Sequence, residues 1–380
     1  MTFEEEMKKI RYEMENGAEE PWVDDTPEFN DLMQRLKTRP IILYGCGAGG
    51  YATADWLEEY NVEIEGYADG KRTGIFPKSG TEIISLEKVL SDYNNCNIYI
   101  TSVNYKDEIK NDLLKGGIPE AQIFMPPEPI PLPPGINLKV NNPDAFLEKH
   151  IEGYKWAYNF FEDEESKRVI IGRLRAFMLG SSFPASPNSP EYFDEEIIKL
   201  SDDEVFVDGG AFYGTFVMRV NSLCNGKFKH IYAFEPELEK CNIMKNEFSK
   251  MTNLTIIQKG LWNKETTLKF CAAKQSSVSS FVFQTSDVTI EVDVTSMDKC
   301  LEGKEPPTFI KMDIEGSEYE ALEGAKNILK TYKPKLAISA YHKPDDIYKL
   351  TRLIHEINPE YKMYLRQPLN IVTETLLYAI

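Results

Sequence analysis

The chain has 380 residues, 42% of them hydrophobic, which predicts two or three domains with packed cores. Asp and Glu number 61 against 43 Lys and Arg, so the formal net charge is −18. This excess of acid argues against nonspecific binding to nucleic acids or anionic lipid, because both depend on attraction by Lys and Arg.

The cysteines and the N-terminal residues indicate the cellular compartment in which the protein is expected. The six cysteines stand singly, without a Cys-x-x-Cys pair, at positions 46, 96, 224, 241, 271 and 300. That pattern argues against a zinc ribbon or a disulfide framework and fits a reducing environment. The acidic start, residues 1–6, is unlike a signal peptide, and no run of 18 apolar residues exists. We therefore expect a cytoplasmic protein without a membrane span.

Residues 1–39 are predicted to form an N-terminal helical arm, because apolar residues recur there at helical spacing. Residues 40–127 are predicted to form a smaller Rossmann-like α/β domain. A strand leads into the G-x-G-x-x-G pattern of Gly45, Gly47 and Gly50, and Asp69 ends the next strand. This context indicates a nucleotide or nucleotide-sugar site at Gly45–Gly50. The alternative is a degenerate unit retained for packing or dimerisation.

Residues 128–200 are predicted to be a proline-rich linker followed by a helical connector. Six prolines in residues 126–134 predict an extended, semi-rigid segment that marks a domain boundary. Two helices are expected, at about residues 143–161 and 163–179. The Ser- and Pro-rich stretch 181–190 is expected to be a loop, either a lid over a substrate or a plain connection.

The stretch from Val205 to Thr215 organises the C-terminal half. An apolar strand ends at Asp208 and Gly209, and the chain then turns through Gly210 into a predicted helix. Glycines let a backbone loop approach a ligand closely, and a helix start offers free N–H groups. The next strand, residues 230–234, leads directly into Glu235, the position that binds a ribose diol in doubly wound folds. A solvated strand-end glutamate is the alternative.

Further strands are predicted to bring other side chains to the same edge of a parallel sheet. The strand at 254–257 leads to Gly260-Leu261-Trp262, an apolar corner able to flank an adenine. Two more strands deliver Asp313 and the pair Tyr341-His342. Helices are expected near 214–224, 236–250, 317–330 and 345–357, an insertion at 274–297, and the last strands at 361–365 and 375–379.

Together these segments resemble the FkbM-type methyltransferases, a branch of the class I S-adenosylmethionine (SAM) enzymes. The resemblance runs from about residue 164 to the C-terminus and is carried by residues 205–211, 234–236, 309–318, 322–325 and 334–342. It implies an α/β fold with a doubly wound, seven-stranded mixed sheet over residues 201–380. Two positions depart from the family: Phe212 replaces the middle glycine of the class I loop, and Gln367 stands where relatives often have His.

The resemblance also implies the site. The expected cofactor is SAM, bound by Asp208, Gly209, Gly210, Ala211, Phe212, Gly214, Thr215, Glu235, Pro236, Gly260, Leu261, Trp262 and Asp313. The expected catalytic residues are His342, Asp313 and Lys311, with His342 as general base because its ordinary pKa lies near neutrality. The alternative for His342 is a hydrogen-bonded histidine at the end of a strand. The expected substrate-binding residues are Glu315, Glu318 and Tyr341.

A metal ion is a further question at this edge of the sheet. Asp313, Glu315 and Glu318 are residue types that bind a hard cation such as Mg²⁺. However, Lys311, Asp313 and Glu315 would share one face of a strand and could form a salt-linked cluster without a metal. We favour the reading without a metal.

The function expected on this resemblance is SAM-dependent O-methyl transfer to a hydroxyl, of a sugar or glycoconjugate precursor. The sugar rests only on the linked N-terminal unit. One alternative is an NAD(P)-dependent or nucleotide-sugar-binding oxidoreductase that uses Gly45–Gly50 and Asp69. Another is a binding protein with a decayed transferase domain, which the changes at Phe212 and Gln367 suggest. The expected partners are a small-molecule or glycan-precursor acceptor and a second copy of the chain, with no nucleic acid and no membrane.

Overall fold

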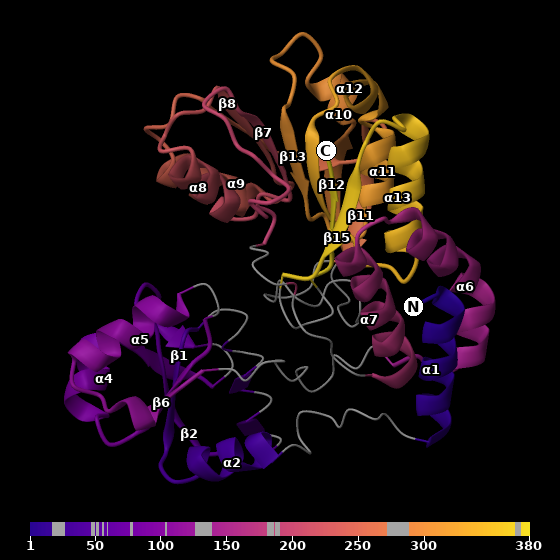
Figure 1. The fold of residues 1–380 in the computed structure, drawn as a ribbon. Helices are drawn as coiled ribbons and strands as arrows, with labels where there is room; N and C mark the ends of the chain where they lie inside the picture. Colours follow the sequence, from indigo (N-terminus) through magenta and orange to yellow (C-terminus); the bar gives the residue numbers. More distant parts are fainter. Residues whose placement is uncertain are drawn as a thin grey trace. The chain divides into compact units, whose positions relative to one another are not determined.

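The computed structural model describes residues 1–16, 27–46, 50, 53–54, 57–58, 60–76, 79–102, 105–125, 139–180, 186, 191–271, 289–368 and 374–380. The chain forms two compact units (Figure 1). The larger unit comprises Met1–Ile10, Val140–Met178 and Phe183–Ile380, and the smaller unit comprises Arg11–Lys139 and Leu179–Ser182. Gly47, the proline-rich stretch 126–135 and all of the loop 181–190 except Ser186 lie outside the described residues.

The smaller unit is built on a six-stranded sheet of order β3-β4-β2-β1-β5-β6. Every neighbouring pair is parallel except β3 and β4. All four residues of β1 are buried, and apolar side chains gather in two clusters around the sheet. The elements are α2 (Pro27–Leu36), β1 (Ile41–Tyr44), β2 (Ile64–Ala68), β3 (Ile75–Phe76), β4 (Thr81–Ile84), α4 (Leu86–Asp92), β5 (Asn97–Ile100), α5 (Lys106–Lys115), η2 (Glu120–Gln122) and β6 (Ile123–Phe124).

The larger unit is built on a seven-stranded sheet of order β15-β16-β14-β13-β7-β8-β9. Five strands are parallel, and β16 runs antiparallel to both β14 and β15. The seven-stranded mixed sheet predicted from the sequence is therefore confirmed. The strands are β7 (Val205–Gly209), β8 (His230–Phe234), β9 (Leu254–Ile257), β13 (Phe309–Met312), β14 (Lys335–Ser339), β15 (Met363–Arg366) and β16 (Leu376–Ala379).

Helices lie on both faces of this sheet. Figure 1 shows α11 and α13 side by side, away from α8 and α9. One end of α6 is capped by Asn142, whose side chain accepts a hydrogen bond from the Ala145 N–H at 3.1 Å. The helices are α6 (Pro143–Phe160), α7 (Glu164–Leu179), α8 (Thr215–Leu223), α9 (Leu238–Glu247), α10 (Met297–Cys300), α11 (Glu318–Glu323), α12 (Lys326–Thr331) and α13 (Asp346–Ile357).

Helix α1 (Phe3–Asn16) contributes residues to both units, because the boundary between them falls after Ile10. Its first turn packs against α6 in the larger unit. The Phe3 and Tyr158 rings lie 5.5 Å apart, and the Tyr158 hydroxyl donates to the Met1 carbonyl at 2.8 Å. The beginning of the chain is thus part of the larger unit.

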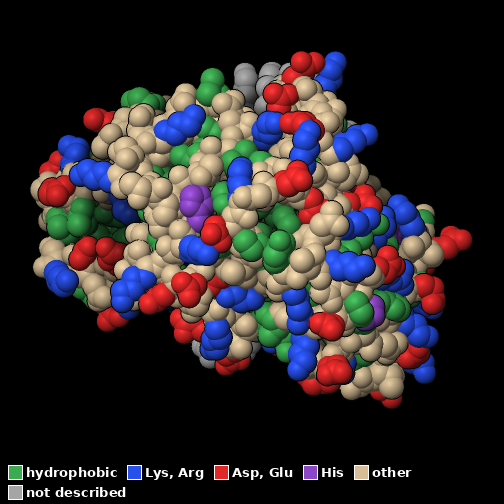
Figure 2. Space-filling model, turned by 90° about the horizontal axis from the view of Figure 1, so that it is seen from above, with side chains coloured by type: hydrophobic (Ala, Val, Ile, Leu, Met, Phe, Trp, Pro, Cys, Tyr) green, Lys and Arg blue, Asp and Glu red, His purple; other side chains and the backbone are tan. Residues whose placement is uncertain are grey.

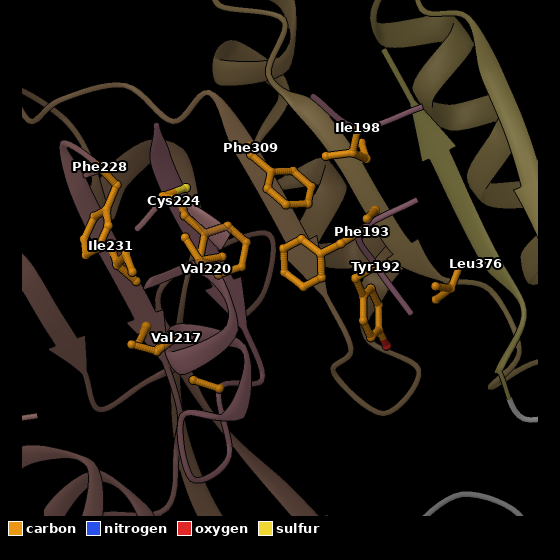
Figure 3. Packing of buried hydrophobic residues seen from close by; sticks show 14 of the residues in the cluster. Tyr192, Phe193, Ile198, Val217, Val220, Cys224, Phe228, Ile231, Phe309 and Leu376 are labelled. Atoms are coloured by element: carbon orange, nitrogen blue, oxygen red, sulfur yellow. The ribbon is translucent and has the colours of Figure 1, made fainter. Parts of the chain in front are cut away.

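One face of the seven-stranded sheet is covered by α8, α9 and the segment 192–198. Alternate residues of the strands, such as Phe206 and Phe309, point to this face, as the two-residue period of a strand requires. The Phe193 and Phe309 rings point toward one another in Figure 3, with centroids 5.8 Å apart in a T-shaped arrangement. This packing fixes the segment that carries Tyr192 against the sheet.

Two local features differ from the sequence prediction. The helix expected at 317–330 is two helices, α11 and α12, broken at Gly324. A Cβ on Gly324 would lie 2.1 Å from the Trp262 carbonyl oxygen, so the break lets another backbone segment approach. The stretch before α10 contributes β11 (Thr266–Cys271) and β12 (Thr289–Thr295), which join β10 (Gly260–Leu261) in a three-stranded sheet. The second half of the expected insertion at 274–297 therefore contains β12, which pairs with β11.

The surface mixes charges of both signs. Acidic and basic side chains are interspersed over the face shown in Figure 2. Among the described residues, no helix is long and apolar enough to cross a membrane.

Candidate active site

The turn between β7 and α8 is a tight glycine loop. Gly210 has φ +73° and Gly214 has φ +83°, values that favour glycine. A Cβ on Gly210 would lie 2.0 Å from the Asp313 carbonyl oxygen, and one on Gly214 would lie 2.4 Å from the Phe248 ring. Both glycines are thus required by backbone angle and by space. Ala211 is buried, whereas Thr215, the first residue of α8, is exposed.

Phe212 occupies the loop position where a glycine was expected. Its backbone is left-handed, with φ +54°, so the loop keeps a glycine-like shape at a cost in strain of about 1–2 kcal/mol. The side chain is 37% exposed, and the Lys240 ammonium lies 4.2 Å from its ring centroid. Phe212 therefore adopts a backbone conformation that favours glycine and adds an exposed ring to the surface of the loop.

Glu235 follows β8 directly and holds the glycine loop. Its Oε2 accepts a hydrogen bond from the Phe212 N–H at 2.9 Å, and its Oε1 accepts one from the Glu237 N–H at 2.9 Å. Burial raises the pKa of Glu235, against the effect of these backbone hydrogen bonds and of Lys240. The structure therefore brings Glu235 to the glycine loop, and each carboxylate oxygen keeps capacity for a further donor.

The predicted apolar corner also borders the loop. A Cβ on Gly209 would lie 2.9 Å from the Leu261 side chain, so Leu261 packs directly on the end of β7. Leu261 is buried, while Trp262 and Pro236 are half-buried. Gly260 and Leu261 form β10, which pairs with β12.

Lys311 and Asp208 form a fully buried ion pair beneath the glycine loop. The Lys311 Nζ lies 3.0 Å from Asp208 Oδ1 and donates to the carbonyls of Gly209 at 3.2 Å and Gly210 at 3.0 Å. Burial raises the pKa of Asp208, and Lys311 opposes that rise. The three N–H donors of Lys311 thus have acceptors in the loop. This geometry makes Lys311 a support for the loop, and its predicted catalytic role stays a prediction.

Asp313, Glu315, Glu318, Tyr341 and His342, here called the His342 cluster, meet beyond β13 and β14. His342 Nε2 lies 3.5 Å from Asp313 Oδ1 and 3.6 Å from Glu315 Oε2, and its Nδ1 lies 3.1 Å from Glu318 Oε1. The Tyr341 hydroxyl donates to Asp313 Oδ1 at 3.1 Å. The residues meet because β13 and β14 are parallel neighbours whose carboxyl ends reach the same edge.

The charges in the His342 cluster set the protonation of the histidine. Burial alone would lower the pKa of His342, but Glu318, Asp313 and Glu315 together raise it to about 10. These three carboxylates therefore favour the protonated imidazole. Burial would raise the pKa of Asp313, but His342, Lys311 and hydrogen bonds from Ser339 and Tyr192 together lower it.

Two further carboxyl groups near Asp313 were not anticipated from the sequence. Burial raises the pKa of Glu191 and, more strongly, that of Glu374. The charge of Asp313 adds to both rises, and the charge of Glu191 adds to that of Glu374. No local pattern marks them, since each is an isolated acid in a loop. Only their neighbours reveal the placement: the Tyr192 hydroxyl lies 2.8 Å from Ser339 Oγ, and the Ala340 N–H donates to the Thr375 carbonyl at 2.9 Å.

Gln367, the second departure from the family, is buried and serves the structure. Its N–H donates to Ser186 Oγ at 2.9 Å, and the Thr375 hydroxyl donates to its Oε1 at 2.7 Å. It therefore ties Ser186 to the connection between β15 and β16.

The smaller unit has a glycine loop of its own. Gly45 has φ +123°, and a Cβ on Gly50 would lie 2.1 Å from the Gly45 carbonyl oxygen, so these two glycines lie close together. Asp69 Oδ2 accepts from the Cys46 N–H at 2.8 Å, and Oδ1 accepts from the N–H groups of Lys71 at 2.8 Å and Arg72 at 2.9 Å. The structure therefore brings Asp69 to the start of this loop.

Comparisons with known proteins address the larger unit. Residues 208–365 match a family model described as Methyltransferase FkbM domain, which confirms the resemblance for that stretch. A search of curated proteins gives no match. The crystal structure of Methyltransferase FkbM from Methylobacillus flagellatus KT is similar in fold, with a TM-score of 0.55 and 22% identity, over 99% of this chain and 99% of that one.

Weaker structural similarities cover about half of this chain. Aeropyrum pernix fibrillarin, described in complex with natively bound S-adenosyl-L-methionine, has a TM-score of 0.32 and 10% identity over 49% of this chain and 71% of that one. SMU.1697c, a methyltransferase of Streptococcus mutans described in complex with SAH, has a TM-score of 0.30 and 11% identity over 49% of this chain and 92% of that one.

Proposed function

We propose, from the premise that residues 208–365 form an FkbM methyltransferase domain, that the larger unit transfers a methyl group from SAM to a hydroxyl. The acceptor that we propose is a sugar or a glycoconjugate precursor. The methyl carbon leaves the sulfonium sulfur, which keeps the bonding electron pair, and binds the acceptor oxygen. The hydroxyl proton passes to a base of the site. The domain itself supports methyltransferase activity, while the cofactor, the oxygen acceptor and the sugar are parts of the proposal.

The glycine loop and Glu235 fit the proposed cofactor. Glu235 would accept hydrogen bonds from the ribose hydroxyls, and Gly210 would border the amino-acid part. Asp208 offers a further observation in support, because its Oδ2 is buried and has no hydrogen-bond partner among the described residues. A buried carboxylate oxygen without a donor is costly, and the ammonium group of SAM would relieve that cost. Gly260, Leu261 and Trp262 would flank the adenine.

The acceptor side of the site is acidic. Asp313, Glu315 and Glu318 surround His342, and the charges of Glu191 and Glu374 reach Asp313. Such a site repels phosphate and carboxylate groups and favours a neutral polyol. This observation supports a sugar hydroxyl as the acceptor, and any diphosphate group of a precursor would lie away from this edge.

The base that we propose is the carboxyl pair Glu191 and Glu374, and His342 takes a positioning role. His342 was predicted to be the base from its ordinary pKa, but a pKa of about 10 leaves the imidazole protonated at neutral pH. Carboxyl groups with raised pKa values match a proton acceptor near neutrality better than Asp313, whose pKa is lowered. Asp313 and Tyr341 would orient the acceptor.

The hydrogen-bonded position of Glu235 at the glycine loop carries the cofactor proposal, and SAM titration tests it. Replacing Glu235 by Ala removes charge-assisted hydrogen bonds of about 1.5–3 kcal/mol each, so calorimetry should show at least tenfold weaker SAM binding. Glu237→Gln is the matched control, because its side chain pairs with Lys240 and only its N–H contacts Glu235. Equal SAM affinity in Glu235→Ala and the control would remove Glu235 from the site.

A second ligand is proposed for the smaller unit, a nucleotide or nucleotide sugar at Gly45–Gly50. The supporting observation is that Asp69 contacts the loop after β1 as Glu235 contacts the loop after β7. Titration of NADH and of nucleoside diphosphate sugars into the protein and into Asp69→Asn tests it. Binding that is saturable and weakened by Asp69→Asn supports the site, while titrations without any heat of binding refute it.

A further inference from the structure

Three side chains of the His342 cluster have the chemistry of metal ligands. Asp313 follows β13, Glu318 begins α11, and His342 follows β14. One potential ligand atom of each lies within 4.8 Å of the other two. Two carboxylates and an imidazole form a donor set suited to first-row divalent cations such as Mn²⁺, Fe²⁺ and Zn²⁺.

The spacing of these atoms is close to what one ion requires. Ligand bonds of about 2.0–2.2 Å place two atoms that share an ion at most about 4.4 Å apart. The closest printed pair, His342 Nδ1 and Glu318 Oε1, is 3.1 Å apart. Small side-chain rotations are therefore sufficient to bring the three groups onto a common centre.

Hydrogen bonds from outside the set orient the two carboxylates. The Ile314 N–H donates to Glu318 Oε1 at 2.9 Å, and the Tyr341 hydroxyl donates to Asp313 Oδ1 at 3.1 Å. Partners of this kind fix ligand orientation in metal sites and contribute to metal affinity. Glu315, between the first two ligands, has a left-handed backbone with φ +56°, the kind of strain that gathers at functional sites.

The burial and hydrogen bonding of the Glu318 carboxylate provide an independent observation. Its side chain is 1% exposed, and its Oε2 is buried without a hydrogen-bond partner among the described residues. Leaving a buried carboxylate oxygen without a donor costs free energy, and the great majority of such atoms in proteins have a partner. The carboxylate that already contacts His342 therefore has an unused oxygen, which a cation would satisfy.

A salt-linked cluster of Lys311, Asp313 and Glu315 without a metal was the reading favoured from the sequence. The charge of Lys311 does lower the pKa of Asp313. However, Lys311 forms its ion pair with Asp208 and donates to the carbonyls of Gly209 and Gly210. Apart from His342, the described contacts of the cluster bring no cationic side chain within ion-pair distance of Asp313 or Glu318.

We propose that Asp313, Glu318 and His342 bind one divalent first-row cation, for which Mn²⁺ is the probe. The ion takes the place of one imidazole proton, which is released to solvent, because a ligating nitrogen needs its lone pair. Three protein ligands leave coordination positions for water or for acceptor hydroxyls. A cation there lowers the pKa of a coordinated hydroxyl and fixes its oxygen, which suits vicinal hydroxyls of a polyol. That acceptor role rests on the proposed function, whereas the metal site itself does not.

The experiment is a calorimetric titration of Mn²⁺ into the full chain after treatment with chelator, without SAM. We expect saturable binding of one ion per chain, and at least tenfold weaker binding in Glu318→Gln, since loss of even an outer partner costs 10–100-fold. Glu302→Gln is the charge-matched control, an exposed acid outside the cluster. Circular dichroism establishes that each variant is folded, and His342→Gln provides a second ligand variant.

Three outcomes decide the proposal. One Mn²⁺ per chain, weakened by Glu318→Gln and unchanged by Glu302→Gln, supports it. Absence of saturable binding to the wild-type chain refutes it, and so does binding that both folded ligand variants retain. Titration of SAM in the presence of chelator is independent of the ion, so that failure of the metal site and failure of the proposed cofactor site are distinguished.

Discussion

The loops after β1 and β7 hold their strand-end acids in the same way. In each, the first glycine donates its N–H to the last residue of the next strand, Gly45 to Ala68 at 2.7 Å and Gly210 to Phe234 at 3.1 Å. In each, one carboxylate oxygen accepts from the loop and the other from the N–H two residues beyond the acid. The two units thus share one arrangement of a strand-end acid and a glycine loop.

The two units differ in the residue that follows the neighbouring strand, which is β5 in the smaller unit and β13 in the larger unit. The Thr101 N–H donates to the Tyr44 carbonyl at 3.0 Å, as the Asp313 N–H donates to the Gly209 carbonyl at 3.1 Å, so the two positions correspond. One carries a neutral hydroxyl and the other an acid that leads into the His342 cluster. The same backbone arrangement therefore carries a neutral threonine in the smaller unit and an ionisable aspartate in the larger unit. The variants below test this division, beginning with the largest expected effect.

The first test concerns the acids near Asp313. We expect Glu374→Gln to lower kcat by about 10²–10⁴-fold with SAM affinity nearly unchanged, because a positioned base contributes by that order. Thr101→Ser, at the position that corresponds to Asp313, should leave kcat unchanged. Steady-state kinetics with an accepted sugar measure both. A Glu374→Gln enzyme within a few-fold of wild type would move the base to another group.

The second test concerns how each loop is held. Lys311→Met leaves Asp208 buried and unpaired, so the free energy of unfolding should fall by about 3–5 kcal/mol. Thr101→Val in the smaller unit removes one hydroxyl that donates to the Gly45 carbonyl at 2.8 Å, and should cost about 0.5–1.5 kcal/mol. Urea unfolding, followed by a probe in each unit, measures both values. Similar losses of unfolding free energy in the two variants would show that leaving Asp208 unpaired costs no more than removing one hydroxyl.

The third test uses the raised pKa of His342. Because its pKa rises from an ordinary 6.5 to about 10 in the folded protein, the added stability is complete below about 6.5 and is lost as the pH rises through about 10. Unfolding in chelator should therefore show a fall of at least about 1.4 kcal/mol from pH 7 to 10, the equivalent of one pKa unit. His342→Gln should show a shallower fall. Parallel pH profiles would contradict the assignment.

The fourth test, with the smallest effect, concerns Phe212. Glycine adopts the left-handed backbone without strain, but it loses the Lys240 contact and is more flexible in the unfolded chain. The relief of backbone strain stabilises the variant, and the other two effects destabilise it. Phe212→Gly should therefore change the free energy of unfolding by less than about 1 kcal/mol and preserve SAM affinity. A loss of SAM binding would show that the ring itself contacts the cofactor.

The sequence was sufficient to predict the backbone frame and the residues that directly follow its strands. Glu235, Asp313 and His342 each come after an apolar run. Parallel pairing of the backbones brings the carboxyl ends of these strands to one edge of the sheet, independently of side-chain contacts. Side-chain partners over long separations were not predictable in this way. The pairing of Lys311 with Asp208 depends on the register between β13 and β7, and no local sequence pattern around either residue predicts that register.

Loop acids were the least predictable part of the site. Glu191 and Glu374 lie in irregular segments, where no period constrains the direction of a side chain. Their nearness to Asp313 follows from contacts that only the fold creates, such as the one between Tyr192 and Ser339. Whether Gln367 belonged to a decayed site was equally open from the sequence, and its buried contacts give it a structural explanation.

The passage of α1 from one unit into the other has a consequence for synthesis. The larger unit comprises Met1–Ile10 and then resumes at Val140, so Arg11–Lys139, most of the smaller unit, is an insertion within it. On the ribosome, the smaller unit is complete before any strand of the seven-stranded sheet has emerged. The ring contact between Phe3 and Tyr158 of α6 can form only after Tyr158 has been translated. We expect the smaller unit to fold first, and the first turn of α1 to dock only after α6 has been translated.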